Sequence, residues 1–327
     1  MAKIRVGILG TGSIVRRIMA DFRMGENYEL TAFASRSYDR AREFADRYGA
    51  KYAYGSYEEL AQSPRVDLIY VASPHNYHKA HTLMMLAGGK HVVCEKPFAL
   101  NDTEADEMIA LARKKGLFLM EAMWSRFLPA MRDLKARVEG GLIGDIYAFT
   151  GNFGFSSEYN PQSRVYSMSL AGGSLMDVGV YPINIAAYFL GCRFTSASSL
   201  AVKAPTGADA RFFSQIGFEG GAGAQILSAV DMATESRVML YGSRGFVEIP
   251  DFWHATRYDA RADGKTQTFR FPEENEGHRH EFAHAAECVL SGRTESPVMP
   301  LNDTREILRV MAKMRREQGI VYPEEQP

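Results

Sequence analysis

The sequence has little cysteine, almost no net charge and no long apolar run, and each shortage excludes a class of protein. Its three cysteines, Cys94, Cys192 and Cys288, lie far apart in 327 residues, which argues against a disulfide framework or a paired-cysteine metal site. The 38 basic and 39 acidic residues leave a formal charge of −1, so no long-range field attracts nucleic acid or anionic lipid. These shortages indicate that the protein occupies a reducing compartment and has no nucleic-acid partner.

Membrane spans and export signals are also missing from the sequence. No uninterrupted apolar run approaches the roughly 20 residues that a bilayer span needs, and residues 1–5 lead into the first apolar stretch without a cleavable signal. We therefore expect a cytoplasmic protein without a membrane partner. Hydrophobic residues make up 46% of the chain, which is enough for a sizeable core, and the length predicts two domains.

Short β-rich runs alternate with helical patterns over the first third of the chain. Apolar residues at helical spacing within 14–22 predict a helix with one buried stripe, and Ser37 and Gly49 are suited to begin and end the next helix. This alternation predicts a parallel sheet covered on both faces, the doubly wound Rossmann fold, at residues 1–122. The candidate strands are 4–10, 28–34, 66–71, 91–95 and 117–122.

The rest of the chain, residues 123–327, has a different pattern. After an amphipathic helix at 129–139, alternating segments separated by glycine-rich or polar turns predict an α+β domain with an open, mainly antiparallel sheet. We expect this domain to bind the substrate, to share a firm interface and the active site with the first domain, and to form a homodimer or higher homo-oligomer through its sheet. The candidate strands are 146–155, 211–218, 223–228, 238–241 and 266–271, and further helices are expected at 181–190, 281–290 and 304–317.

A glycine-rich turn follows the first strand and opens the first helix. A phosphate can approach helix N-terminal amides only where glycine removes the obstructing Cβ, and Gly10 and Gly12 meet that requirement. Val15 stands where this fingerprint usually has Gly or Ala, so the pattern is incomplete, and an ordinary glycine turn is the alternative. In this strand-turn-helix context we predict a dinucleotide site that includes Gly10, Thr11, Gly12, Ser13 and Ile14.

The end of the second strand bears on which dinucleotide binds. An acidic residue normally holds the free ribose hydroxyls about 20 positions beyond the glycines, but this chain has Ser35-Arg36-Ser37 there, followed by Arg40. A guanidinium at a helix N-terminus suits a 2′-phosphate through charge-assisted hydrogen bonds. We therefore expect Ser35, Arg36 and Arg40 to bind NADP in preference to NAD, and a solvated arginine on a helix surface is the alternative.

Two segments carry groups suited to hydride transfer, which needs a proton donor or acceptor beside the substrate oxygen and a cation to steady its charge. Glu95-Lys96-Pro97 stands at the end of the predicted strand 91–95, on the carboxyl edge where ligands bind in open α/β sheets. A glycine turn at 171–174 leads to Asp177 and Tyr181, which share one helical face if the turn is helical. Each residue also has a plainer interpretation: Lys96 in a surface turn, Tyr181 in the core, and Asp177 as a helix cap.

The motifs at these positions resemble those of one known family. Glu95-Lys96-Pro97, the run 73–78 after the predicted strand 66–71, and the Asp-x-Gly-x-Tyr stretch at 177–181 resemble, as an ordered set, the glucose-fructose oxidoreductase/inositol dehydrogenase (Gfo/Idh/MocA) family. The resemblance covers nearly the whole chain. Residues 121–127 and Arg164 resemble more narrowly the branch that contains dimeric dihydrodiol dehydrogenase and NADP-dependent xylose dehydrogenase.

The resemblance implies roles for individual residues. Lys96 would hydrogen-bond the reacting hydroxyl and the nicotinamide ribose, and Pro97 would follow a cis peptide bond. Tyr181 would take the place of the family's usual catalytic histidine, and Asp177 would orient the site. Because a free tyrosine has a pKa of about 10, a neighbouring ammonium such as that of Lys96 would favour the phenolate.

The resemblance also implies what surrounds the two reactants. His78, Trp124 and Arg164 would border the nicotinamide. The cofactor side as a whole would include Ser73, Pro74, His75, His78, Glu95, Lys96, Trp124 and Arg164. The substrate pocket would include Lys96, Trp124, Phe153, Phe155, Asp177 and Tyr181. Val15, Ala171 and Ser174 depart from the family's usual pattern.

One motif points to different chemistry. His280-Glu281-Phe282-Ala283-His284 has the His-Glu-x-x-His spacing that puts two imidazoles on one helical face for zinc. A zinc hydrolase would need a third ligand, and the residues that follow provide no recognisable extension. The resemblance places this helix in the second domain, away from Lys96. We therefore expect no metal site, with zinc hydrolysis as a remote alternative.

The expected protein is an NADP-dependent dehydrogenase or reductase, with NAD possible, that acts on a CH–OH group. Its expected substrate is a small sugar, a sugar derivative or a vicinal diol. The alternative from another class is a sensor or regulator that binds the cofactor without turnover, because a fold does not guarantee activity. Lys96 and Tyr181 argue against that alternative.

Overall fold

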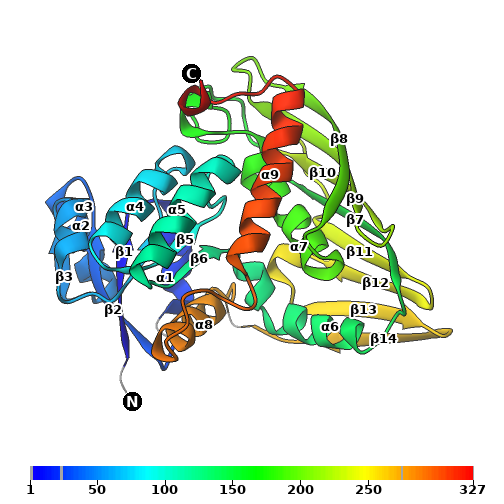
Figure 1. Cartoon of the computed structure of the whole chain (residues 1–327), viewed down its shortest axis with the longest axis horizontal. Coiled ribbons are helices and arrows are strands. Elements are labelled where there is room, and N and C mark those ends of the chain that lie inside the picture. The colour runs from blue at the N-terminus through cyan, green and yellow to red at the C-terminus, as the bar shows by residue number, and fades with distance from the viewer. Residues whose placement is uncertain (1–2, 23–24, 274, 327) are drawn as a thin grey trace. The chain divides into compact units, whose positions relative to one another are not determined.

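The computed structural model describes residues 3–22, 25–273 and 275–326. It divides the chain into two compact units, each with its own sheet (Figure 1). The first unit comprises Met1–Trp124 and Glu274–Thr304, and the second comprises Ser125–Glu273 and Arg305–Pro327. Across the described ranges, no helix is both long enough and apolar enough to cross a membrane.

The sheet of the first unit is parallel throughout and has the strand order β3-β2-β1-β4-β5-β6. The strand order reverses between β1 and β4, and ligands of such sheets bind at the carboxyl ends of the strands beside that point. All four residues of β4 are buried, as expected for a strand covered on both faces. This arrangement confirms the predicted doubly wound Rossmann fold. The strands are β1 (Ile4–Leu9), β2 (Tyr28–Ala34), β3 (Tyr52–Tyr54), β4 (Leu68–Val71), β5 (His91–Glu95) and β6 (Leu119–Ala122).

The helices of the first unit begin and end at residues whose chemistry favours those positions. The Ser37 hydroxyl accepts a hydrogen bond from the amide of Arg40 at 3.4 Å, and Gly49 ends the same helix with a left-handed φ of 79°. Asn101 and Gly116 delimit α5 in the same way. The helices are α1 (Ser13–Phe22), α2 (Tyr38–Tyr48), α3 (Tyr57–Gln62), α4 (His78–Ala87), α5 (Asp102–Lys115) and α8 (Arg279–Leu290).

The segment that carries α8 returns to the first unit, although the sequence analysis assigned all of 123–327 to a second domain. The helix packs against α1, β1 and β2, and the ring of Phe282 meets Phe22 edge-on at 4.7 Å. The expectation that the His-Glu-x-x-His helix lies in the second domain, away from Lys96, is therefore wrong, because both belong to the first unit. Periodicity shows that a helix has an apolar face but not which partner covers it.

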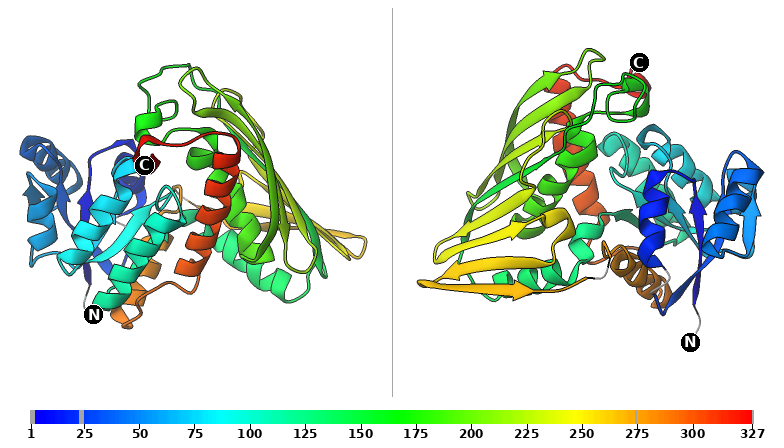
Figure 2. Two further views of the ribbon diagram at one scale, coloured as in Figure 1. Left: turned by 45° about the horizontal axis from the view of Figure 1, so that its top comes forward. Right: turned by 180° about the vertical axis from the view of Figure 1, so that it is seen from behind.

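The sheet of the second unit has the order β14-β13-β12-β11-β7-β10-β9-β8. Its neighbouring strands are antiparallel except for the parallel pair β7 and β10, which confirms the predicted open, mainly antiparallel sheet. Among the described residues, helices cover one face of this sheet and none covers the other (Figures 1 and 2). The strands are β7 (Ile146–Gly154), β8 (Phe194–Lys203), β9 (Asp209–Phe218), β10 (Gly223–Ala229), β11 (Arg237–Gly242), β12 (Gly245–Pro250), β13 (Arg257–Ala262) and β14 (Lys265–Arg270). The helices are α6 (Pro129–Glu139), α7 (Val180–Leu190) and α9 (Leu301–Glu317). The first turn of α9 belongs to the first unit.

Candidate active site

The glycine turn between β1 and α1 has the geometry that a bound diphosphate requires. Gly10 has a left-handed φ of 107°, and a Cβ there would lie 2.7 Å from the carbonyl oxygen of Ala72, so only glycine is accommodated. A Cβ on Gly12 would have no described atom within 4 Å, and the amides that open α1 are reachable from that open side. Val15 is fully buried. The turn therefore fits a dinucleotide despite its incomplete fingerprint.

Two arginines lie at the end of β2, where the adenosine ribose of a dinucleotide is bound. The Nε of Arg40 donates a hydrogen bond to Oγ1 of Thr11 at 3.2 Å, and its guanidinium lies over the ring of Phe44 at 5.7 Å. Arg40 thus borders the glycine turn itself. Arg36 is exposed, and Ser35 is buried beside it.

The loop between β4 and α4 holds the predicted residues Ser73, Pro74 and His75, and His78 is the first residue of α4. The ring of His78 is fully buried, with Nδ1 at 2.8 Å from the carbonyl oxygen of Pro97 and Nε2 at 2.9 Å from that of Ser73. Burial lowers the pKa of His78, so the neutral ring donates to one carbonyl and links this loop to the next. The Ser73 hydroxyl oxygen is buried without a hydrogen-bond partner among the described residues.

The turn that carries Lys96 follows β5 and contains the cis Lys96–Pro97 bond that the resemblance implies. The Glu95 carboxylate is buried and accepts two hydrogen bonds, one from the Tyr70 hydroxyl at 2.6 Å and one from the Lys96 amide at 3.0 Å. This carboxylate therefore anchors the turn on its strand side.

A second buried glutamate anchors the far side of the same turn. Glu121, on β6, accepts a hydrogen bond from the Phe98 amide at 3.1 Å and another from the Thr304 hydroxyl at 3.0 Å. Because both carboxylates accept from the backbone around it, the turn has a defined path. Trp124 follows β6 directly, is buried, and stacks on His278 with ring centroids 4.1 Å apart. His278 was not predicted as a site residue, because no sequence motif associates it with Trp124.

In the second unit, Asp177 lies in a π-helical turn (Leu175–Gly179) that runs into α7 and places Tyr181 one turn further on. The Asp177 carboxylate is buried and accepts a hydrogen bond from Nη1 of Arg164 at 2.7 Å. π-Helical turns are rare and occur frequently at functional sites. The structure therefore brings Arg164 and Asp177 into one ion pair.

The ring of Tyr181 lies at the end of a row of aromatic contacts. Phe153 meets the Tyr181 ring edge-on at 5.5 Å and stacks on Trp253 at 5.6 Å. Phe155, predicted to line the substrate pocket, packs against the buried cluster of Val165, Tyr166, Ala210 and Val230. Trp253 was not predicted as a site residue, because its short helical turn shows no periodic signal.

The glycine turn before Asp177 is held by Asp209 on β9. The Asp209 carboxylate accepts hydrogen bonds from the Leu175 amide at 2.6 Å and the Ser174 hydroxyl at 2.7 Å, and burial raises its pKa to about 6. Ala171 adopts a left-handed φ of 54°. The two departures from the family pattern are therefore accommodated, Ser174 by supplying a hydroxyl and Ala171 by a backbone conformation rare for L-residues.

The side chains of the His-Glu-x-x-His stretch have partners other than a metal. Glu281 is fully buried, and its Oε1 lies 3.4 Å from the Tyr70 hydroxyl. Nε2 of His284 lies 2.8 Å from the Ser296 hydroxyl and 3.4 Å from Sγ of Cys288. Within the described ranges, no three His, Cys, Asp or Glu side chains converge as metal ligands do. This geometry does not support the zinc-hydrolase alternative.

Each unit contains a segment that matches a family model of oxidoreductases. Residues 4–123 match the family model described as "Oxidoreductase family, NAD-binding Rossmann fold", and residues 131–248 match the "GFO/IDH/MocA C-terminal domain". Trans-1,2-dihydrobenzene-1,2-diol dehydrogenase of Mus musculus is 32% identical over 98% of this chain and 99% of the mouse protein.

Solved structures with the same fold include an aldose-aldose oxidoreductase and a 3-ketoreductase. An aldose-aldose oxidoreductase from Caulobacter crescentus, complexed with glycerol, is 28% identical with a TM-score of 0.88, covering 97% of this chain and 98% of that one. A 3-ketoreductase from Actinomadura kijaniata, in complex with NADP and TDP-benzene, is 28% identical with a TM-score of 0.84, covering 96% and 97%. Structures of this ketoreductase also exist with a tyrosine replaced by phenylalanine and with a lysine replaced by alanine or glutamate.

Proposed function

Because the chain belongs to the Gfo/Idh/MocA family of NAD(P)-binding oxidoreductases, we propose that it transfers a hydride between NADP and a CH–OH carbon of a small sugar or vicinal diol. The observation that carries the proposal is the turn of Lys96, which buried Glu95 and Glu121 hold at the carboxyl edge of the Rossmann sheet. The substrate class follows from relatives named for a diol, an aldose and a keto group.

The proposed chemistry divides the work between two side chains. The bound nicotinamide supplies or accepts the hydride. The Lys96 ammonium donates a hydrogen bond to the substrate oxygen and steadies its negative charge, while the Tyr181 phenol gives or takes the proton. A nearby ammonium favours the phenolate when Tyr181 acts as the base. Asp177, paired with Arg164 at 2.7 Å, orients the substrate side, and Phe153 packs edge-on to the phenol ring.

The test is a substrate panel followed at the absorbance of the reduced nicotinamide. Purified protein with NADPH is offered aldoses, keto sugars and dicarbonyls, and with NADP it is offered aldoses and vicinal diols. Turnover of at least one member supports the proposal. NADPH binding without turnover on any member favours the sensor alternative.

Cofactor preference is proposed to depend on Arg36 and Arg40. In Arg36→Asp, the loss of a charged hydrogen bond and the new repulsion are expected to weaken NADPH binding by about tenfold to a hundredfold, because such bonds contribute about 1.5–3 kcal/mol. NADH has no 2′-phosphate and should lose much less. Cofactor fluorescence titrations measure both affinities.

Arg42→Asp is the matched control for that experiment, because Arg42 lies on α2, the helix that follows Arg36, and pairs with Asp46. It makes the same change of charge and should alter neither affinity. Equal losses of NADPH and NADH affinity in Arg36→Asp would refute the phosphate assignment.

Self-association is proposed through the helix-free face of the second unit's sheet. Leu200, Phe213, Leu227 and Asn152 occupy directly paired positions on β8, β9, β10 and β7, so they form one row across the sheet. Leu200 is 61% exposed and Phe213 40%. A second copy of the chain would cover this apolar row, since closed two-fold pairing is the commonest form of oligomer.

Light scattering tests the dimer. The unaltered protein is expected at twice the 36.5 kDa of one chain, and Phe213→Glu is expected at the mass of one chain, because it would bury like charges in the pair. Thr266→Glu, on exposed β14, adds the same charge outside the row and should stay dimeric. A single-chain mass for the unaltered protein, or an unchanged mass for Phe213→Glu, would contradict the proposed interface.

A further inference from the structure

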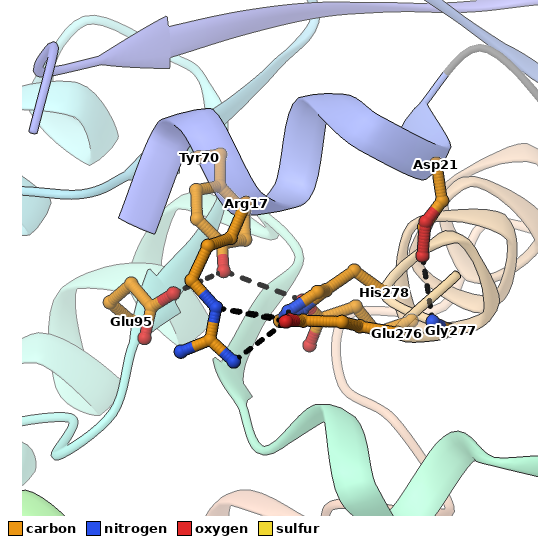
Figure 3. A network of polar contacts seen from close by, with 8 residues as sticks. Arg17, Asp21, Tyr70, Glu95, Glu276, Gly277 and His278 are labelled. Atoms are coloured by element: carbon orange, nitrogen blue, oxygen red, sulfur yellow. Dashed lines mark hydrogen bonds and ion pairs between the residues drawn. The ribbon is translucent and has the colours of Figure 1, made fainter. Parts of the chain in front are cut away.

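A chain of buried polar side chains lies behind the turn of Lys96, in the first unit (Figure 3). The Tyr70 hydroxyl, on β4, stands between two carboxylates, 2.6 Å from Oε1 of Glu95 and 3.4 Å from Oε1 of Glu281. Glu281 is fully buried, and its Oε2 has no hydrogen-bond partner among the described residues. Glu95 in turn accepts from the Lys96 amide. The glutamate of the His-Glu-x-x-His stretch thus lies beside the hydroxyl that donates to Glu95.

His278 extends this chain to Trp124. Its Nδ1 lies 3.7 Å from Oε1 of Glu281 and its Nε2 lies 3.2 Å from Oε2 of Glu276, while its ring stacks on Trp124 at 4.1 Å. Arg17, on α1, donates to both oxygens of Glu276 at 2.9–3.1 Å. The imidazole is therefore enclosed between two carboxylates and an indole.

The charges around His278 favour its cationic form. Burial lowers the pKa of His278, but the carboxylates of Glu276 and Glu281 outweigh that effect and raise it to about 9. Glu95 also raises the pKa of His278, and Arg17 donates to Glu276. An imidazolium stacked on an indole gains a cation–π attraction, which fixes the orientation of the indole.

Glu281 is surrounded by a different set of groups. Burial raises the pKa of Glu281 to about 7, and His278 opposes the rise. The charge of Glu95, on β5, raises this pKa further, whereas the hydrogen bond from Tyr70, on β4, lowers it. The Tyr28 hydroxyl interacts electrostatically with Glu281, with Asp21 and with Arg279. Asp21 accepts the Gly277 amide at 2.8 Å, which holds the segment before α8 against α1.

We propose that His278 and Glu281 are positioning residues for hydride transfer, His278 acting on Trp124 and Glu281 acting through Tyr70 and Glu95 on Lys96. The proposal rests on the proposed function, in which Lys96 and Trp124 adjoin the reacting groups. It gives a reason for the complete burial of the glutamate in the His-Glu-x-x-His stretch. The network would hold the Lys96 turn and the Trp124 indole in one arrangement before the substrate binds.

The contact of His278 with Trp124 has a spectroscopic signature that needs no enzymatic activity. The chain has only two tryptophans, so Trp253→Phe leaves the emission of Trp124 alone. Because an imidazolium in contact with an indole quenches its fluorescence, the emission of Trp124 should rise as the pH passes about 9. Adding His278→Gln should abolish this rise, and adding His284→Gln, which replaces a neighbouring histidine of the same segment, should preserve it. Identical pH curves with and without His278 would overturn the first arm of the proposal.

Kinetics test the Glu281 arm. Glu281→Gln is expected to lower kcat about tenfold, the effect of one charged hydrogen bond, with the KM for NADPH unchanged. The double variant Tyr70→Phe/Glu281→Gln should be no slower than Tyr70→Phe alone, because residues that act in series are not additive. Glu287→Gln makes the same change at an exposed position of α8 and should leave kcat unaltered. Equal rates for the Glu281 and Glu287 variants, or additive losses in the double variant, would overturn this arm.

Two controls separate this proposal from its premise. NADPH titration and thermal unfolding show that each variant is folded before its rate is interpreted. If the unaltered protein turns over no substrate, the proposed function fails, whereas the Trp124 titration still decides whether His278 is the cation that holds the indole.

Discussion

Tyr181→Phe and Lys96→Met are each expected to lower kcat by about 10²- to 10⁴-fold, the usual contribution of a positioned acid or base. Tyr181→Phe keeps the ring that Phe153 meets edge-on at 5.5 Å and removes only the hydroxyl, so NADPH should bind as before. Lys96→Met keeps the length of the side chain and removes the ammonium that steadies the substrate oxygen. Steady-state rates on the best substrate of the panel measure both losses.

Matched variants show whether these losses belong to the reaction. Tyr188→Phe removes a phenol from the same helix, where its hydroxyl accepts from Arg132 at 3.4 Å, and Lys79→Met removes an ammonium that pairs with Glu107 on the surface. Neither should change kcat. Because Lys96 and Tyr181 are proposed to serve one oxygen, the double variant should be little slower than the worse single variant. Near-normal turnover by Tyr181→Phe would exclude the phenol as the proton carrier.

Glu325→Ala is expected to lower the free energy of unfolding of the second unit by about 3–5 kcal/mol, since it leaves a buried guanidinium without its counter-charge. Arg315, on α9, is 0% exposed and Glu325 is 7% exposed, and two hydrogen bonds of 2.5 and 2.8 Å join them. The guanidinium also lies over the ring of Tyr322 at 4.2 Å. The shift of the urea midpoint at an unchanged slope measures the loss.

Glu325→Ala is also expected to weaken substrate binding at the candidate site, because the C-terminal segment contacts the turn before Asp177. The Tyr322 hydroxyl donates to the carbonyl oxygen of Gly172 at 2.8 Å, and that glycine turn leads to Asp177 and Tyr181. Loosening the terminus should therefore raise the KM for the substrate as well. Glu324→Ala alters the neighbouring exposed carboxylate and should have neither effect. An unchanged urea midpoint in Glu325→Ala would show that the buried pair adds no stability.

The elements that the sequence analysis located best are those whose signals are local. The ends of α6 and the limits of β2 and β5 agree with the predicted ranges, because periodicity and capping residues act within one or two turns. Gly10 was identified from the glycine pattern of its own turn, where the structure gives it a left-handed φ of 107°. The catalytic roles of Lys96 and Tyr181 remain predictions.

Other elements had no local signal. β8 reads Phe-Thr-Ser-Ala-Ser-Ser-Leu-Ala-Val-Lys, too polar and too rich in small residues for a strand pattern, and it is defined by its pairing with β9. The parallel pairing of β7 with β10 joins strands about 70 residues apart. Asp209 and His278 became apparent only through their partners, the Ser174 hydroxyl and the Trp124 ring.

The sequence by itself determined the Rossmann domain, its glycine turn, the arginines after β2 and the family to which these motifs point. Those features depend on neighbours along the chain, where steric limits and side-chain spacing act directly. Only the tertiary structure decided that 274–304 returns to the first unit, that Glu281 faces Tyr70 and that Asp209 holds the turn before Asp177. Burial and hydrogen bonding between distant segments are settled by packing, which no local pattern records.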